Sequence, residues 1–203
     1  MINYMYPFGL SRIALIALVI VSAASVARLG DLPKCDRAES YRIGKQTVEI
    51  CEWKKEGAES QGYLQIAVVS DKGMVDVVTD DILGEFMSSG ISDLDGNQNP
   101  EVYVLAQSAG SGSYPELHMY ELRGGELEDL TLPELDELQA HGYMGHDRIV
   151  FEADRIIREF PIYGANDVNA QPTGATRRMI YRLSSKRLTL ESRVDIAPSE
   201  ETK

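Results

Sequence analysis

Cysteine and histidine are scarce in this chain, and their scarcity excludes several kinds of site. The 203 residues include two cysteines and three histidines, and the histidines fit no HExxH or other ligand spacing. Two cysteines cannot build a zinc cage by themselves. The sequence has no GxGxxG or Walker loop, and it has no nucleophile elbow, because Ser111 is flanked by Ala109 and Ser113 where that elbow needs glycines.

Positive charge is also in short supply. Twenty basic residues face 32 acidic ones, which gives a formal net charge of −12. Phosphate backbones would be repelled, so the composition argues against nucleic acid as a partner. The same charge favours a cationic partner, because opposite charges speed encounter at low salt.

The chain lacks an apolar run of the roughly 18 residues that span a membrane. Its longest run, Ile13–Val21, follows the single strong base of residues 1–27, Arg12, and precedes the small residues Ser25-Val26-Ala27. This order is typical of a secretory signal. We predict a signal peptide over 1–27 that is cleaved after Ala27, a periplasmic protein with no membrane span after cleavage, one domain over 28–197 and a disordered tail over 198–203. The alternatives are an uncleaved anchor and a lipid anchor at Cys35.

The two cysteines therefore enter an oxidising compartment. Cys35 and Cys51 are predicted to form a disulfide, because a pair of exported cysteines is usually bridged. Loss of the single base Arg12 with the signal takes the formal charge from −12 to −13. About 176 residues then remain, which is enough for one domain with a substantial core.

Long amphipathic helices are absent from the pattern, which consists of short runs with period two or continuous apolar character, separated by turn residues. We predict a mostly β protein, an antiparallel β-sandwich or flattened barrel with one short helix over Pro133–Ala140. Thr131 and Glu134 have capping-box spacing for that helix. The predicted strands cover 47–53, 63–69, 74–78, 101–106, 117–122, 148–151, 155–160, 179–183 and 187–190.

An acidic turn precedes the strand predicted at 101–106. It carries oxygen donors at alternate positions, namely Asp93, Asp95, Asn97, Asn99 and Glu101. Such a loop can wrap its carboxylates around one calcium ion, which prefers six to eight oxygens. The alternative is a tight polar turn whose side chains bond the local backbone. Both readings stay open at this point, with calcium the only cofactor indicated and none required.

A small, glycine-rich loop follows the same strand, over 107–115. Its centre is Ser111, Gly112, Ser113 and Tyr114, in which Tyr114 is the one large side chain. Loops of this composition protrude and follow irregular paths, and Ser and Tyr are favoured in binding loops. The alternative is a plain hairpin loop with Tyr114 folded back on the core.

A third cluster, Gly142–Arg148, contains His146 next to Asp147. These two residues have catalytic chemistry, but a structural role in holding a loop is the more common one for such a pair. Downstream, Arg177 and Arg178 are expected to pair with nearby carboxylates.

The residues from Pro100-Glu101-Val102-Tyr103 to Ser111-Gly112-Ser113-Tyr114 resemble the bacterial periplasmic inhibitors of invertebrate-type (i-type) lysozyme. Those proteins carry an S-G-x-Y loop after a strand that opens on an Asp-rich turn. The resemblance extends from about Ser92 to Leu190 and includes GHDRIVFEADRIIREFPIY. The cysteine pair is outside it.

The resemblance implies a protein without catalysis of its own, whose loop enters the lysozyme cleft. Ser111 and Tyr114 would be the inserted residues, and Gly112 would permit the turn. Two other functions remain alternatives: a calcium-stabilised exported β module that binds glycan or cell-envelope components, and an exported hydrolase.

Overall fold

The computed structural model describes residues 35–198, and every regular element in that range is a β-strand. The predicted signal peptide lies outside the described residues. Within them, no helix is long and apolar enough to cross a membrane. The strands are β1 (Arg37–Ile43), β2 (Gln46–Lys55), β3 (Ala58–Ser70), β4 (Gly73–Ile82), β5 (Gly84–Ser92), β6 (Glu101–Ser108), β7 (Pro115–Arg123), β8 (Glu126–Asp129), β9 (Arg148–Phe151), β10 (Ile156–Pro161), β11 (Thr176–Ser184) and β12 (Arg187–Ile196).

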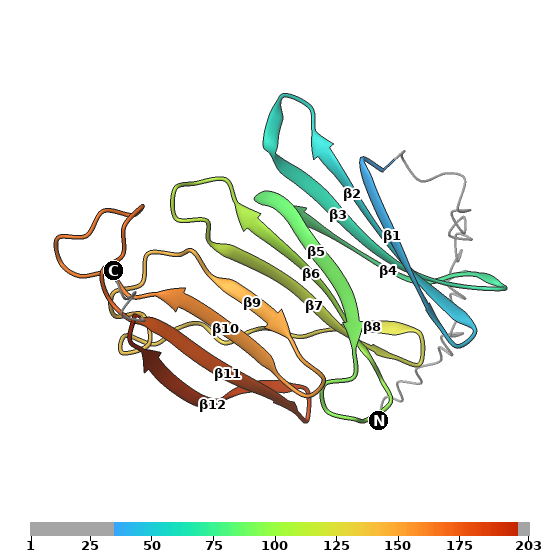
Figure 1. Cartoon of the computed structure of the whole chain (residues 1–203). Coiled ribbons are helices and arrows are strands. Elements are labelled where there is room, and N and C mark those ends of the chain that lie inside the picture. The colour runs from blue at the N-terminus through green and yellow to red at the C-terminus, as the bar shows by residue number, and fades with distance from the viewer. Residues whose placement is uncertain (1–34, 199–203) are drawn as a thin grey trace, which may run out of the picture.

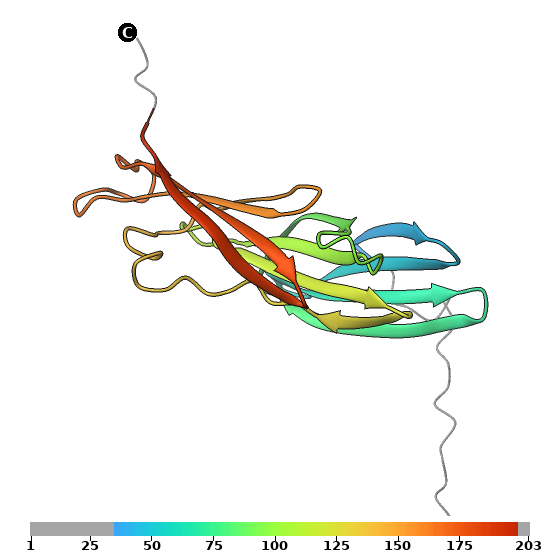
Figure 2. The same cartoon turned by 90° about the horizontal axis from the view of Figure 1, so that it is seen from below.

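The strands form three antiparallel sheets of four, each made from one continuous stretch of chain. Sheet β5–β8 lies between sheet β1–β4 and sheet β9–β12 (Figure 1). The view turned by 90° shows the same order along the molecule (Figure 2). Neighbouring strands joined by short turns explain why the turn signals of the sequence locate the hairpins well.

The middle sheet is covered on both faces, which accounts for the continuous apolar character of β6. Val102, Val104 and Ala106 point into a core shared with sheet β1–β4. Tyr103 faces the other way and stacks on Phe151 of β9, with ring centroids 3.6 Å apart, in a core shared with sheet β9–β12. A strand buried on both faces loses the alternation of polar and apolar residues.

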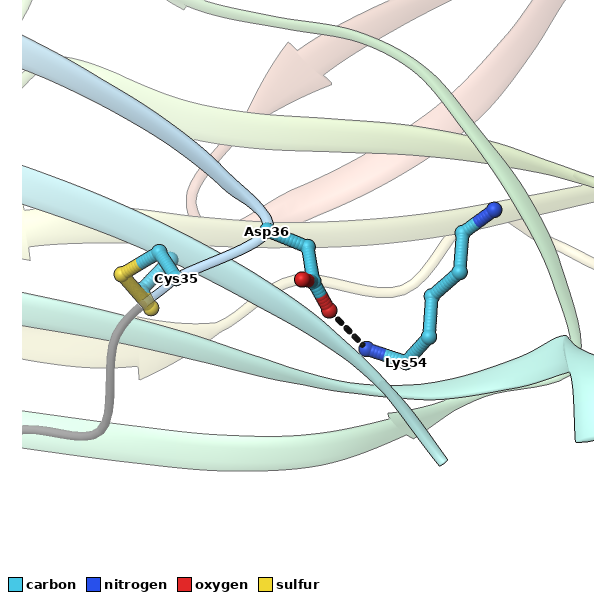
Figure 3. The surroundings of a disulfide bond; sticks show 4 residues. Cys35, Asp36 and Lys54 are labelled. Carbon is cyan, nitrogen blue, oxygen red and sulfur yellow. Dashed lines mark hydrogen bonds between the residues drawn. A yellow bond between two sulfur atoms is a disulfide. The ribbon is translucent and has the colours of Figure 1, made fainter. Parts of the chain in front are cut away.

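The predicted disulfide is present. Cys35 and Cys51 are bonded, with their Cα atoms 5.4 Å apart and a sequence separation of 16. Beside it, the Asp36 carboxylate accepts a hydrogen bond of 2.8 Å from the backbone N–H of Lys54 (Figure 3). In the chain-entropy model, closing so short a loop contributes roughly 3 kcal/mol, and the bond holds the start of β1 against β2.

The prediction of a mostly β antiparallel protein is confirmed, whereas the short helix over Pro133–Ala140 is wrong. That segment makes one helical turn, closed by a bond from Ala140 N–H to the Asp136 carbonyl. The reciprocal capping bonds join Asp136 and Gln139 instead of Thr131 and Glu134. Gly142, with φ +72°, then turns the chain away. A single turn does not repay the cost of helix nucleation.

Candidate functional site

The Ser-Gly-Ser-Tyr loop joins β6 to β7 at one end of the middle sheet. The hairpin closes through the bond from Ser108 N–H to the Tyr114 carbonyl, 2.8 Å, and through Tyr114 N–H to the Ser108 hydroxyl, 2.9 Å. A tight turn tops it, with Ser113 N–H bonded to the Gly110 carbonyl at 2.9 Å. Ser113, with φ +45°, carries the unusual backbone conformation of this turn. The positive φ of the turn therefore falls on Ser113, and Gly112 contributes through its lack of a side chain.

Three consecutive backbone carbonyls of the loop are each held by a different part of the molecule. The Asn169 amide donates to the Ser111 carbonyl at 2.8 Å, and His146 N–H donates to the Gly112 carbonyl at 2.6 Å. The Gln107 side chain donates to the Ser113 carbonyl at 3.0 Å. Figure 1 shows why these groups meet, since the β6–β7 loop, the segment before β9 and the β10–β11 loop gather at the same end. The loop is thus fixed at its backbone.

Glycine is required where the loop meets the segment before β9. A Cβ on Gly145, which has φ +90°, would lie 1.9 Å from the Gly112 carbonyl oxygen. A Cβ on Gly112 would lie 2.3 Å from the Tyr114 ring and 3.0 Å from the Met144 carbonyl oxygen. Gly112 therefore allows the Tyr114 ring and the Met144 backbone to approach closely.

The Tyr114 ring rests edge-on against Tyr143, with centroids 5.7 Å apart, while 46% of the Tyr114 surface stays exposed. Tyr143 is itself fixed, because its hydroxyl donates to Asp147 at 2.5 Å and accepts from Arg158 at 3.0 Å. Burial and the Asp147 carboxylate raise the pKa of Tyr143 well above its ordinary value. Tyr114 is therefore neither free nor folded into the core, but supported from one side.

The hydroxyl groups of the loop are left available. Those of Ser111, Ser113 and Tyr114 make no hydrogen bond with the described residues, although the carbonyls of residues 111–114 each accept one. Ser111 and Tyr114 are both exposed. Hydroxyls can donate and accept, so this loop offers a rigid set of polar groups to a partner.

The β10–β11 loop that supplies Asn169 is itself well bonded. The Asp167 carboxylate accepts from Gly164 N–H and from the N–H and hydroxyl of Thr173, at 2.8 Å in each case. These bonds hold the pKa of Asp167 below its ordinary value. The Asn169 carbonyl accepts from the buried Tyr163 hydroxyl at 2.9 Å. An ordered loop therefore presents the Asn169 amide to Ser111.

The His146–Asp147 pair has the predicted structural role. Asp147 has no exposed side-chain surface and forms an ion pair of 2.5 Å with Arg158 rather than a hydrogen bond with His146. The His146 ring bonds the Asn169 side chain at 2.9 Å. The arginine pairs expected downstream are present, since Arg177 bonds Asp195 and Arg178 bonds Glu159. Asn169 was missed, because no local pattern links it to a loop 58 positions earlier.

The acidic turn lies at the opposite end of β6, roughly 23 Å away for seven residues of strand. Its side chains bond the local backbone: Leu94 N–H donates to Glu101 at 2.7 Å and Asn97 N–H to Asp95 at 3.1 Å. Asn99 N–H donates to the Asn97 side chain at 2.6 Å, and Gln98 N–H donates to Asp93 at 3.2 Å. This is the geometry of the polar turn.

Two carboxyl oxygens of that turn, Asp93 Oδ1 and Glu101 Oε1, are buried and have no hydrogen-bond partner. Burial raises the pKa of Glu101 to about 7, with Asp95 and Asp93 adding to the effect and Leu94 N–H opposing it. Among the described residues, no three His, Cys, Asp or Glu side chains are grouped so as to hold a metal ion. A calcium ion here would need amide and backbone oxygens as further ligands.

No protein-family model matches the chain, and no curated protein matches it. Two solved structures are similar to part of it. One is PliI-Ah of Aeromonas hydrophila, a periplasmic lysozyme inhibitor of I-type lysozyme, at 24% identity and a TM-score of 0.42 over 51% of this chain and 98% of that chain. The other is Aeromonas hydrophila PliI in complex with Meretrix lusoria lysozyme, at 25% identity and a TM-score of 0.41 over 51% and 94%. Both are proteins of the family that the loop motif resembles.

Proposed function

We propose that the protein is a periplasmic lysozyme inhibitor, most directly of i-type lysozyme, and that it inserts the Ser111–Tyr114 loop into the lysozyme active-site cleft. The observation that carries the proposal is the loop itself. Its backbone carbonyls are bonded to three separate segments, while the hydroxyls of Ser111 and Tyr114, both exposed residues, make no hydrogen bond within residues 35–198. On this proposal the protein acts by binding and has no catalytic residues.

The chemistry of the target suits such a loop. A retaining glycosidase holds two carboxyl groups about 5 Å apart, one protonated and one ionised. A hydroxyl can donate to the ionised carboxylate and accept from the protonated one. Ser111 and Tyr114 are three positions apart across a turn, so they can address two neighbouring groups together.

Rigidity supports the proposal on energetic grounds. Binding loses affinity when a loop must first be ordered, by roughly 0.5–1.5 kcal/mol for each flexible side chain. The bonds to Asn169, His146 and Gln107 order this loop in the free protein. The formal net charge of −12 should also raise the rate of association with a basic lysozyme.

The test is inhibition of a purified i-type lysozyme by the mature protein, followed as clearing of a cell-wall suspension. Tyr114→Ala should weaken inhibition by roughly 30- to 1,000-fold, because buried aromatic anchors commonly contribute about 2–4 kcal/mol. Tyr114→Phe should fall between wild type and Tyr114→Ala, and Ser111→Ala should lose about 1–3 kcal/mol by leaving a partner group unpaired.

Leu138→Ala is the matched control, because Leu138 is 73% exposed and lies outside the loop. It should inhibit like wild type, and all variants should melt at similar temperatures. A Tyr114→Ala variant as potent as wild type would remove the loop from the proposal. A wild type that slows no lysozyme would overturn the function itself.

A second candidate is a calcium-stabilised exported module that binds glycan or other cell-envelope components. The buried, unpartnered oxygens of Asp93 and Glu101 favour it, because a cation would satisfy both. Cosedimentation with purified cell walls in calcium or chelator separates the two functions. The module would pellet with walls in calcium, whereas the inhibitor would need lysozyme to be present.

A further inference from the structure

A groove lies beside Tyr114, on the side where its ring contacts Tyr143. It has a volume of about 260 Å³. Leu117, Leu132 and Ile149 line it, the rings of Tyr114 and Tyr143 form another wall, and Glu134 stands at its rim. Sites for drug-sized ligands usually run from about 300 to 1,000 Å³. The groove is therefore small for a sugar chain, and its size suits one long side chain.

The free charge at the groove is negative. Arg158 also borders it, but that guanidinium is paired with the buried carboxylate of Asp147 at 2.5 Å. Glu134 is exposed and makes no hydrogen bond or ion pair with the described residues. The surrounding segment, residues 129–137, contains four acidic residues and no basic one. A cation entering the groove would meet one unpaired carboxylate, and the positive charge that borders the groove, Arg158, is already neutralised by Asp147.

A basic side chain suits this groove, because its stem is apolar and its head is charged. Lysine and arginine carry an apolar stem that lies along aliphatic surface and a charged head that stays near water. Cations also bind over the faces of tyrosine rings, and a guanidinium can both stack on a ring and pair with a carboxylate. Leu117, Leu132 and Ile149 would contact the stem, and Glu134 would meet the head.

We propose that this groove receives a lysine or arginine side chain of the lysozyme while the Ser111–Tyr114 loop occupies the lysozyme cleft. The proposal rests on the inhibitor function above and assigns a second contact to it. Tyr114 belongs both to the Ser111–Tyr114 loop and to the lining of the groove. The interface is then reciprocal, since each protein inserts a group into the other.

The experiment measures association and dissociation rates of the mature protein with purified i-type lysozyme at low and high ionic strength. Glu134→Lys should weaken binding by roughly 10- to 100-fold and Glu134→Gln by roughly 3- to 10-fold, mainly through faster dissociation, because a short-range contact is lost. The matched control is Glu137→Lys, which makes the same charge change at an exposed, unpaired position outside the groove. It should change mainly the association rate, and by less than about 3-fold, with the difference disappearing in high salt.

A steric variant tests occupancy without changing charge. Thr131 lies on the groove wall and is exposed, so Thr131→Trp should fill the groove, weaken binding at both ionic strengths and leave the melting temperature unchanged. Equal losses for Glu134→Lys and Glu137→Lys, with Thr131→Trp binding like wild type, would overturn the groove contact. If Tyr114→Ala still abolishes inhibition in that case, the inhibitor function stands alone. A wild type that binds no lysozyme overturns both proposals.

Discussion

The side-chain amide of Asn169 donates a hydrogen bond of 2.8 Å to the backbone carbonyl of Ser111, which precedes it by 58 positions. The same side chain bonds the His146 ring, and His146 N–H in turn holds the Gly112 carbonyl. One residue of the β10–β11 loop therefore sets the position of the loop between β6 and β7. The shape that a partner meets is determined outside the Ser-Gly-Ser-Tyr motif.

Replacing Asn169 by Asp keeps its shape but turns the donor toward Ser111 into an acceptor. We expect inhibition to weaken by roughly 2- to 13-fold, the equivalent of one hydrogen bond of about 0.5–1.5 kcal/mol. Amide exchange at residues 110–113 should become faster. Asn166→Asp, an exposed change in the same loop, is the control. Unchanged exchange in Asn169→Asp would show that the loop is ordered without this bond.

Gly145→Ala should displace the loop more strongly. Its Cβ would meet the Gly112 carbonyl oxygen at 1.9 Å, and φ +90° is unfavourable for alanine by about 1–2 kcal/mol. We expect at least a 10-fold loss of inhibition with a folded protein, judged by its melting curve. Gly110→Ala is the matched control, because nothing lies within 4 Å of a Cβ there. Equal potency of the two variants would contradict the prediction.

Most of the strands can be predicted from their patterns, and the hairpins around 152–154 and 184–186 are confirmed. Strands β1, β5 and β8 were not predicted, and β5 escaped because it contains Gly84, Ser88, Ser89 and Gly90 and has a bulge after Phe86. Those glycines are demanded by contacts from elsewhere: a Cβ on Gly84 would lie 2.1 Å from the Gln107 carbonyl oxygen. Such a requirement depends on a neighbouring strand, so it is invisible in a local pattern.

The two carboxylates beside His118 make the stability of the fold depend on pH. Its ring lies between Asp80 of β4 and Glu116 of β7, 3.2 Å from each, and so connects two sheets. Burial alone would lower the pKa of His118, but the two carboxylates outweigh it and raise the pKa above 6.5. The contribution of His118 to stability is therefore complete below pH 6.5 and is lost as pH rises through the raised pKa.

The measurement is the free energy of unfolding of wild type and His118→Gln across that range. The difference between them should be largest near about pH 6 and should shrink in alkaline buffer. Asp80 and Glu116 have lowered pKa values, so their share is lost only as pH falls into the acid range. A difference that does not vary with pH would rule out the ion-pair explanation.

The acidic turn gives a prediction for calcium. If Asp93, Asp95, Asn97, Asn99 and Glu101 bind the ion, calcium must raise the melting temperature relative to chelator. The free energy of unfolding should rise by about 2.7 kcal/mol when calcium is at 100 times its dissociation constant. Glu101→Gln should remove most of this difference. Glu126→Gln, an exposed change at the first residue of β8, should keep it. Identical melting in calcium and chelator would leave the polar turn as the full account.

The candidate site was predictable only in its exposed part. Composition located the loop and Tyr114, because small residues around one aromatic mark a protruding segment, and the family resemblance singled out Ser111. The groups that hold the loop come from two later segments, through His146 and Asn169. Their partners are backbone carbonyls, which every residue has, so nothing in the sequence identifies the pairing.

The middle sheet belongs to both hydrophobic cores, and this sharing determines how the molecule should come apart. Loss of sheet β1–β4 would expose the face formed by Val102 and Val104, and loss of sheet β9–β12 would expose Met119. Neither outer sheet can leave without uncovering apolar surface, so unfolding should be cooperative across all three. The β6–β7 hairpin, protected from both sides, should then be the last segment to exchange its amide protons with solvent. The loop at its tip is therefore anchored in the most persistent part of the fold.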